Sequence, residues 1–99
     1  MAKLTEYNQI YLEATQAGVG TTDAITNIPN PSTVIVIPTL GSTASAEYTT
    51  DPTYTAWEPW AMGSVTAYAN DVLVADILAL RLRVTSGTAT MRIIGGRRG

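Results

Sequence analysis

Two tryptophans three positions apart, Trp57 and Trp60, are the side chains of this chain with the clearest capacity for binding. Indole faces stack on sugar rings, and Glu58, Asp51 or Asn70 would accept hydrogen bonds from sugar hydroxyls. The competing interpretation is structural. If the segment is extended, residues three apart point to opposite faces. We therefore favour Trp57 in the core between two sheets and Trp60 at its rim.

The scarcity of large aromatic side chains supports a structural role for one indole. The chain contains no Phe, so two Trp and five Tyr supply all of its large aromatic volume. On this interpretation, Trp57→Ala lowers the free energy of unfolding by about 3–5 kcal/mol. The alternative is a carbohydrate-binding module that contacts host glycans through Trp60 and Tyr54.

Pairs of carboxylates are the second candidate for chemistry, namely Asp71 with Asp76 and Glu47 with Asp51. Glycoside hydrolysis needs two carboxyl groups at a defined separation, and a calcium loop needs several oxygen ligands at short intervals. Neither spacing occurs, so we expect these residues to form turns or to face solvent. The chain also has no Cys and no His, which removes the usual nucleophiles, bases and zinc ligands. We predict no catalytic, cofactor-binding or metal-binding residues and no enzymatic activity.

Arginines form the third candidate, because five of the six basic residues lie in the last nineteen positions of a chain whose net charge is −2. So small a basic surface does not bind nucleic acid strongly. Arginine is, however, enriched where proteins contact one another. Arg81, Arg83 and Arg92 are therefore expected to form a local basic stripe that contacts a protein partner, and a solvated outer face is the alternative.

The composition favours a single domain whose surface is easily buried. The 99 residues are 45% hydrophobic and only 14% charged, against about a quarter charged in ordinary soluble domains. Much of the surface must then be Thr, Ser, Ala and Asn, which a partner can cover at little cost. No apolar run approaches the ~18 residues of a membrane span, and the first residues lack the layout of a secretory signal. We expect a soluble protein made in a cytoplasm.

Alternating apolar residues predict the strands that position these side chains. The clearest case is residues 78–93, in which Leu78, Leu80, Leu82 and Val84 share one apolar face and the chain turns at Ser86–Gly87. A two-residue hairpin loop there would pair Val84 with Ala89, Leu82 with Met91 and Leu80 with Ile93 on the core side. On the outer side it would set Arg81 opposite Arg92, so we expect something acidic nearby, either a bound anion or a partner carboxylate.

Other segments give shorter strands. Residues 34–37 are an unbroken β-branched run, which predicts a central strand or one covered on both faces. Further strands are expected over residues 42–49 and through Val65 and Ala67, the latter closed by a turn at Asn70–Asp71. Residues 7–12 fit a short helix as well as a strand, and residues 15–32 indicate a loop with one brief strand near Ile25.

The predicted fold class is all-β: a small antiparallel β-sandwich, of jelly-roll or immunoglobulin-like type, with an extended N-terminal arm. Residues 1–30 form the arm or a first strand with a loop. Residues 31–95 form the sandwich core, and residues 96–99 form a flexible basic tail.

A further pattern runs through residues 42–94, about half of the chain. A strand ends in the turn YTTDP, a Trp-x-x-Trp segment and a GSV strand follow, and the segment ALRLRVTSGTAT comes last. This order resembles a recurrent layout of small structural proteins of tailed bacteriophage virions, such as capsid decoration or cement proteins, head-fibre bases and accessory tail domains. The shared motifs are turns and core positions, so the resemblance implies an adhesive role and no catalytic residues.

The resemblance implies a non-enzymatic virion protein, assembled in the host cytoplasm, that binds and stabilises the phage head as a decoration or cement subunit. The implied partners are the major capsid protein or other virion proteins, in a multi-copy or homo-oligomeric assembly, with no nucleic acid and no membrane. A glycan-binding module and an accessory tail or neck protein are the alternatives. The candidate partner contacts are Tyr7, Tyr11, Trp60, Arg81, Arg83 and Arg92.

Overall fold

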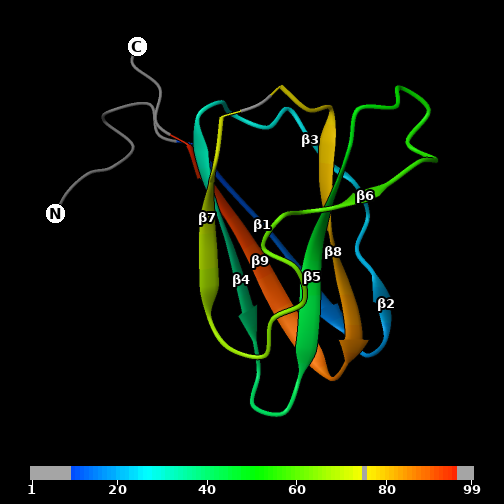
Figure 1. The fold of residues 1–99 in the computed structure, drawn as a ribbon, viewed down its shortest axis with the longest axis vertical. Coiled ribbons are helices and arrows are strands. Elements are labelled where there is room, and N and C mark those ends of the chain that lie inside the picture. Colours follow the sequence, from blue (N-terminus) through cyan, green and yellow to red (C-terminus); the bar gives the residue numbers. More distant parts are fainter. Residues whose placement is uncertain (1–9, 75, 96–99) are drawn as a thin grey trace, which may run out of the picture.

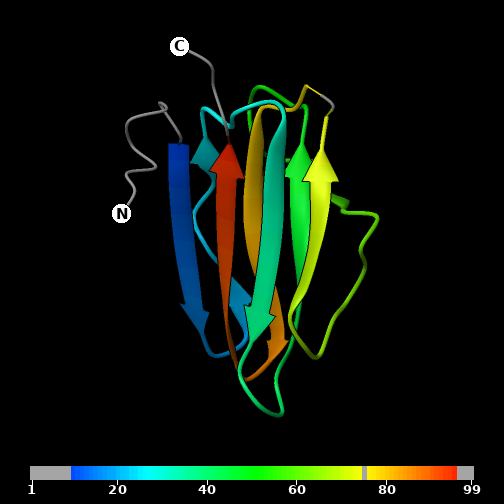
Figure 2. The ribbon, with the colours of Figure 1, turned by 90° about the vertical axis from the view of Figure 1, so that its left-hand side faces the viewer.

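The computed structural model describes residues 10–74 and 76–95, which form nine β-strands. The strands are β1 (Ile10–Ala17), β2 (Gly20–Thr21), β3 (Ile25–Thr26), β4 (Ser32–Pro38), β5 (Thr43–Thr49), β6 (Glu58–Pro59), β7 (Ala69–Leu73), β8 (Ala79–Ser86) and β9 (Thr88–Gly95). A four-stranded sheet has the spatial order β1-β9-β4-β7, and a five-stranded sheet has the order β2-β8-β5-β6 with β3 also paired to β8. Figure 1 and Figure 2 show the two sheets packed face to face. The predicted small antiparallel β-sandwich is confirmed.

The core lies between the sheets and consists of small and aliphatic side chains. Alternate residues of each long strand point inward, as a period of two requires. The fully buried members come from both sheets: Val34, Val36, Ala44, Ala46, Leu73, Leu80, Leu82, Val84, Ala89, Met91 and Ile93. The predicted core face is confirmed from Leu80 to Ile93, but Leu78 lies before β8 and is 43% exposed, so its assignment to the core is wrong. Within the described ranges, no helical segment has the length and hydropathy needed to span a bilayer.

The predicted pairing of the last two strands is wrong, because β8 and β9 belong to different sheets. β8 pairs with β5, whereas β9 pairs with β1 and β4. Gly87 carries the chain from one sheet to the other at φ +83°, and a Cβ added there would collide with the Ser42 side chain. A hairpin and a crossing between sheets bury the same alternate residues, so the apolar pattern does not distinguish them.

β4 is the central strand that its β-branched run predicts, since it lies between β9 and β7. Val34 and Val36 face the core. Ile35 points to the outer face and is also buried, with Arg92 and Asn70 as its cross-strand neighbours. The prediction of a central strand is confirmed, and Ile35 is buried by the side chains that flank it on the outer face.

Two local expectations differ from the structure. Asn70 and Asp71 lie within β7 rather than in a turn, and Val65 forms only an isolated bridge with Ala44. The turn preference of Asn and Asp is overridden here because β7 pairs with β4 along five residues. Of the ambiguous segment 7–12, the described residues 10–12 belong to strand β1, which pairs with β9 over eight residues. The brief strand near Ile25 is confirmed as β3.

Candidate functional site

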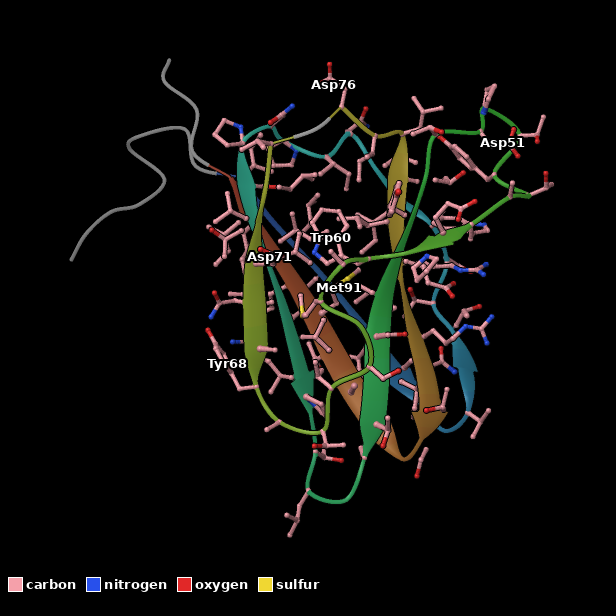
Figure 3. All side chains as sticks on the ribbon, in the orientation of Figure 1. Asp51, Trp60, Tyr68, Asp71, Asp76 and Met91 are labelled. Carbon is pink, nitrogen blue, oxygen red and sulfur yellow. The ribbon has the colours of Figure 1, made fainter. Side chains whose placement is uncertain are left out.

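Trp60 points inward at the side of the sandwich formed by β6 and β7. Its ring packs against the core cluster and meets Tyr48 edge-on, with ring centroids 5.7 Å apart and planes at 90°. Its indole N–H donates a 2.9 Å hydrogen bond to Oδ2 of Asp71 on β7. Figure 3 shows Trp60 and Asp71 directed toward each other between the sheets. The side chain predicted at the rim therefore bridges the two sheets.

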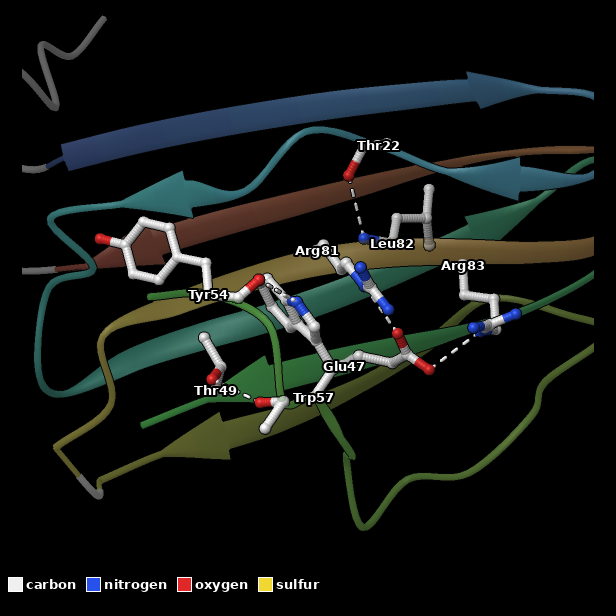
Figure 4. A network of polar contacts seen from close by, with 9 residues as sticks. Thr22, Glu47, Thr49, Tyr54, Trp57, Arg81, Leu82 and Arg83 are labelled. Atoms are coloured by element: carbon white, nitrogen blue, oxygen red, sulfur yellow. Dashed lines mark hydrogen bonds and ion pairs between the residues drawn. The ribbon is translucent and has the colours of Figure 1, made fainter. Parts of the chain in front are cut away.

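Trp57 lies on the outer face of the five-stranded sheet, so the predicted places of the two indoles are exchanged. The Arg81 guanidinium carbon lies 4.3 Å from the Trp57 ring centroid, and the indole N–H donates to the Tyr54 carbonyl at 3.0 Å (Figure 4). Pro59 pairs with Glu47, a residue of the outer face. Alternation from Pro59 puts Trp57 on that same face and Trp60 on the inner one. The expectation of opposite faces is confirmed, and the assignment of Trp57 to the core is wrong.

Glu47 bridges two of the candidate arginines. Arg81 Nε donates to its Oε1 at 2.7 Å, and Arg83 Nε donates to its Oε2 at 2.9 Å. Partial burial opposes ionisation of Glu47, but the two arginine hydrogen bonds outweigh it and lower the pKa of this carboxyl. The expected Arg81–Arg92 pair does not form, so the anion or partner carboxylate predicted beside it has no basis. Glu47 of the chain itself bonds Arg81 and Arg83.

The three arginines do not form one face. Arg81 and Arg83 lie on the five-stranded sheet, whereas Arg92 lies on the four-stranded sheet and donates to Oε2 of Glu13 at 3.4 Å. The prediction of a shared basic stripe is wrong because β8 and β9 are in different sheets. Of the remaining candidates, Tyr11 lies on the outer side of β1, and Tyr7 is outside the described residues, as is the 96–99 tail.

Asp51 organises the loop that follows β5. Its carboxylate accepts hydrogen bonds from the N–H groups of Thr53, Thr55 and Ala56 and from both threonine hydroxyls. Led by the Thr53 N–H, these bonds lower the pKa of Asp51 well below its usual range. The turn-forming role expected of Asp51 is confirmed. The loop holds Tyr54 at φ 58°, a backbone conformation that bulky residues rarely adopt.

The other carboxylates serve separate local contacts. Asp76 accepts a hydrogen bond from the Asn30 amide at 2.8 Å, and Asp71 accepts the one from Trp60. Across residues 10–74 and 76–95, no group of three or more His, Cys, Asp or Glu residues is placed to hold a metal ion. The side chains of Tyr54 and Trp60 also lie apart: Trp60 is at the centre of Figure 3, and the Asp51 loop that carries Tyr54 projects from the upper right.

The outer face of the four-stranded sheet is a site that sequence reasoning missed. One row across its strands contains Tyr11, Ile94, Thr33 and Val72. Tyr11 is 53% exposed and Val72 is 60% exposed. The adjoining rows contain Glu13, Arg92, Ile35 and Asn70, then Thr15, Thr90 and Ile37.

This outer face is close to neutral and rich in apolar and hydroxyl groups. Its two charged residues, Glu13 and Arg92, bond to each other, and the Thr15 and Thr90 hydroxyls lie 2.9 Å apart. The face is assembled from four segments that are distant in the chain. The sequence carries one signal of this face. Residues 34–37 are apolar at every position, so an apolar residue must also lie on the side of the strand that faces away from the core.

A hollow opens beside Trp60 on the β6–β7 side. Its volume is about 290 Å³, and its walls are mostly apolar: Tyr48, Pro59, Trp60, Ala61 and Ile77. A second hollow, of about 440 Å³, lies between β1 and the β2–β3 segment and has a mainly polar lining. The first hollow offers few partners to the hydroxyl groups of a sugar.

A scan against protein-family models found no match, and a search of curated protein sequences found none either. Function must therefore be inferred from the chain's own residues and their geometry.

Proposed function

We propose that this chain is a non-enzymatic structural protein of a bacteriophage virion, which attaches to the head as a capsid decoration or cement protein. The outer face of the four-stranded sheet is the observation that carries the proposal. It combines exposed apolar side chains with hydroxyl groups, and its two charges neutralise each other. The resemblance of residues 42–94 to small virion proteins supplies the class of partner.

Such a face suits contact with a protein lattice. Tyr11 and Val72 offer apolar area, and a row of Thr and Ile side chains loses few hydrogen bonds when water leaves. The four strands are five to eight residues long and cover roughly 450 Å² at ordinary strand spacing. That area is below the ~800 Å² that each partner buries in a standard stable interface. Attachment would then depend on many copies or on added contacts between copies, as expected of a cement protein.

The two alternatives, an accessory tail or neck protein and a carbohydrate-binding module, fit this geometry to different degrees. An accessory tail or neck protein would use the same kind of face and would differ in the number of copies per particle. The carbohydrate-binding alternative gains no support, because Trp60 packs against the core cluster and the hollow beside it is mainly apolar. Tyr54 is exposed, but Trp57 beside it is engaged with Arg81.

Binding to particles tests the proposal. Virions of the phage that encodes the chain, stripped of it, are mixed with purified wild type or with the double variant Tyr11→Ser, Val72→Ser. We expect the double variant to bind at least tenfold more weakly, because it loses the two most exposed apolar groups of the outer face. Tyr54→Ser removes an exposed tyrosine from the Asp51 loop, away from the outer face, and is the matched control, expected to bind as wild type does. Equal binding of the double variant and wild type would contradict the proposal that the outer face contacts the capsid.

A further inference from the structure

The turn that joins β4 to β5 presents a leucine wholly to solvent. The relative exposure of Leu40 is 103%. Leu40 occupies the second position of a β-turn in which the Ser42 N–H donates to the Thr39 carbonyl at 2.9 Å. Gly41, at φ +82°, supplies the positive φ that a type II turn needs at its third position. Nothing in the turn itself requires an apolar side chain at Leu40.

The turn is fastened to the neighbouring strand. The Thr39 N–H donates to the Thr88 carbonyl at 2.9 Å, and the Thr88 N–H donates to the Ser42 hydroxyl at 2.9 Å. The Thr39 and Ser42 hydroxyls lie 2.7 Å apart and share a further hydrogen bond. Leu40 therefore projects from a turn that several hydrogen bonds hold in place, which limits the conformational entropy lost when a partner covers it.

The end of the sandwich around Leu40 carries no charge. The turns at residues 17–21, 38–43 and 85–88 contain no acidic or basic residue. They meet at the lower end of Figure 1, where the Gly18 N–H donates to the Gly87 carbonyl at 2.8 Å. Val19, 75% exposed, is a second apolar side chain there. Asp51 and Asp76 lie at the opposite end (Figure 3).

The hollow beside Trp60 has the chemistry to receive this end. An enclosed apolar cavity of about 150 Å³ is enough to bind benzene, so this hollow of about 290 Å³, which is open to solvent on one side, has room for a leucine side chain. The Trp60 N–H is already bonded to Asp71, so an apolar group can enter without displacing a hydrogen bond. Glu58 adjoins the lining residue Pro59, and an uncharged end meets it and Asp71 without like-charge repulsion.

We propose that Leu40 of one copy inserts into the hollow beside Trp60 of a second copy, so that copies associate head to tail. The two surfaces differ, so the contact is heterologous and repeats into a ring or a filament. One leucine in one hollow buries far less than the ~800 Å² per partner of a stable interface, so free copies associate weakly. Copies held side by side would associate strongly, because tethering raises their effective concentration to about the millimolar range. The inference concerns the chain alone and goes beyond the proposed function.

Self-association of the full chain is the first test. Sedimentation equilibrium up to about millimolar concentration, with ¹⁵N NMR spectra over the same range, should show weak association together with shifts of the Trp60 indole and Leu40 amide signals. Leu40→Ser should lower the association constant about 10- to 100-fold, the loss expected for one buried leucine, with no change in Tm. Val72→Thr removes an exposed apolar group from the outer face and should leave association unchanged. A wild type that stays monomeric, with a fixed Trp60 signal, overturns the proposal.

A mixing experiment tests the head-to-tail geometry. Ala61→Arg blocks the hollow at an exposed lining residue and keeps Leu40, whereas Leu40→Ser keeps the hollow. Neither variant should associate alone, but an equimolar mixture should form heterodimers and nothing larger. Association of Leu40→Ser by itself, or a folded mixture that remains monomeric, contradicts this contact. Because no particle is present, failure here leaves the capsid proposal standing, and failure of particle binding leaves this contact standing.

Discussion

The indole N–H of Trp60 donates a 2.9 Å hydrogen bond to the carboxylate of Asp71 and thereby joins the two sheets at their β6–β7 side. Trp60 follows an edge strand of the five-stranded sheet, and Asp71 lies on an edge strand of the four-stranded sheet. The two-residue strand β6 contributes little backbone pairing of its own. The bond and the ring packing of Trp60 therefore hold that side of the sandwich closed.

Replacing the two tryptophans should separate their roles. We expect Trp60→Ala to lower the free energy of unfolding by about 3 kcal/mol, because it removes a large ring from the core cluster. Trp57→Ala should cost about 1 kcal/mol, since its ring lies outside and mainly contacts Arg81. Urea denaturation monitored by far-UV circular dichroism measures both. Equal losses for the two variants would show that the outer indole is as important to the fold as the inner one.

Acid should remove the contribution of Glu47. Its pKa is lowered in the folded state, so its stabilisation is complete above the unfolded carboxyl pKa of about 4.3 and is lost as pH falls through the lower folded value. We expect Glu47→Gln to reduce the unfolding free energy by about 1 kcal/mol at pH 7, a small value because the two arginine bonds lie near solvent. The difference from wild type should shrink toward pH 3. If the unfolding free energies of wild type and Glu47→Gln differ by the same amount from pH 7 to pH 3, this role of the ion pairs is contradicted.

Any side chain at Gly87, where the chain crosses from β8 to β9, should lower the free energy of unfolding. We expect Gly87→Ala to cost about 1–2 kcal/mol for its left-handed φ. Collision with Ser42 should add about 1–3 kcal/mol. Gly41→Ala is the matched control: it has a similar φ of +82° but open space around its Cβ, so only the conformational cost applies. Thermal unfolding followed by calorimetry compares the two variants. If Gly87→Ala and Gly41→Ala lower Tm by the same amount, the close approach of residue 87 to Ser42 contributes nothing to the loss of stability.

The Asp51 loop should lose order when its carboxylate is removed. In Asp51→Ala, the N–H groups of Thr53, Thr55 and Ala56 lose their acceptor, and we expect their hydrogen exchange to accelerate at least tenfold. Asp76→Ala is the control, because Asp76 accepts a single side-chain bond from Asn30. Residue-resolved exchange by NMR is the measurement. Unchanged protection at all three amides would mean that other contacts fold the loop.

Periodicity in the sequence predicts which side chains are buried but not which strands pair. The pattern correctly predicts that Leu82 and Met91 face the core, yet they belong to different sheets. Alternation is a local property of one strand, whereas pairing depends on contacts between distant segments, such as the close approach of Ser42 to Gly87. The alternation of Trp57 and Trp60 was likewise correct, but their direction followed from the pairing of Pro59 with Glu47.

The candidate site was less predictable than the fold for the same reason. The outer face of the four-stranded sheet brings together Tyr11, Val72 and Ile94 from strands β1, β7 and β9, and only the tertiary arrangement makes them neighbours. Of the predicted contacts, Tyr11 and Arg92 lie on this face, and Arg81 and Arg83 lie on the other sheet. Arg81, Arg83 and Arg92, which are close together in the sequence, therefore lie on two different surfaces of the fold.

The number of copies in the particle tests the proposed virion role most directly. Virions of the encoding phage are purified, and the chain and the major capsid protein are quantified together by mass spectrometry against isotope-labelled standards. A decoration or cement protein should be present at a fixed ratio to the major capsid protein, near a ratio of small whole numbers. Absence of the chain from the particle, or a few copies in place of that ratio, would contradict the capsid role.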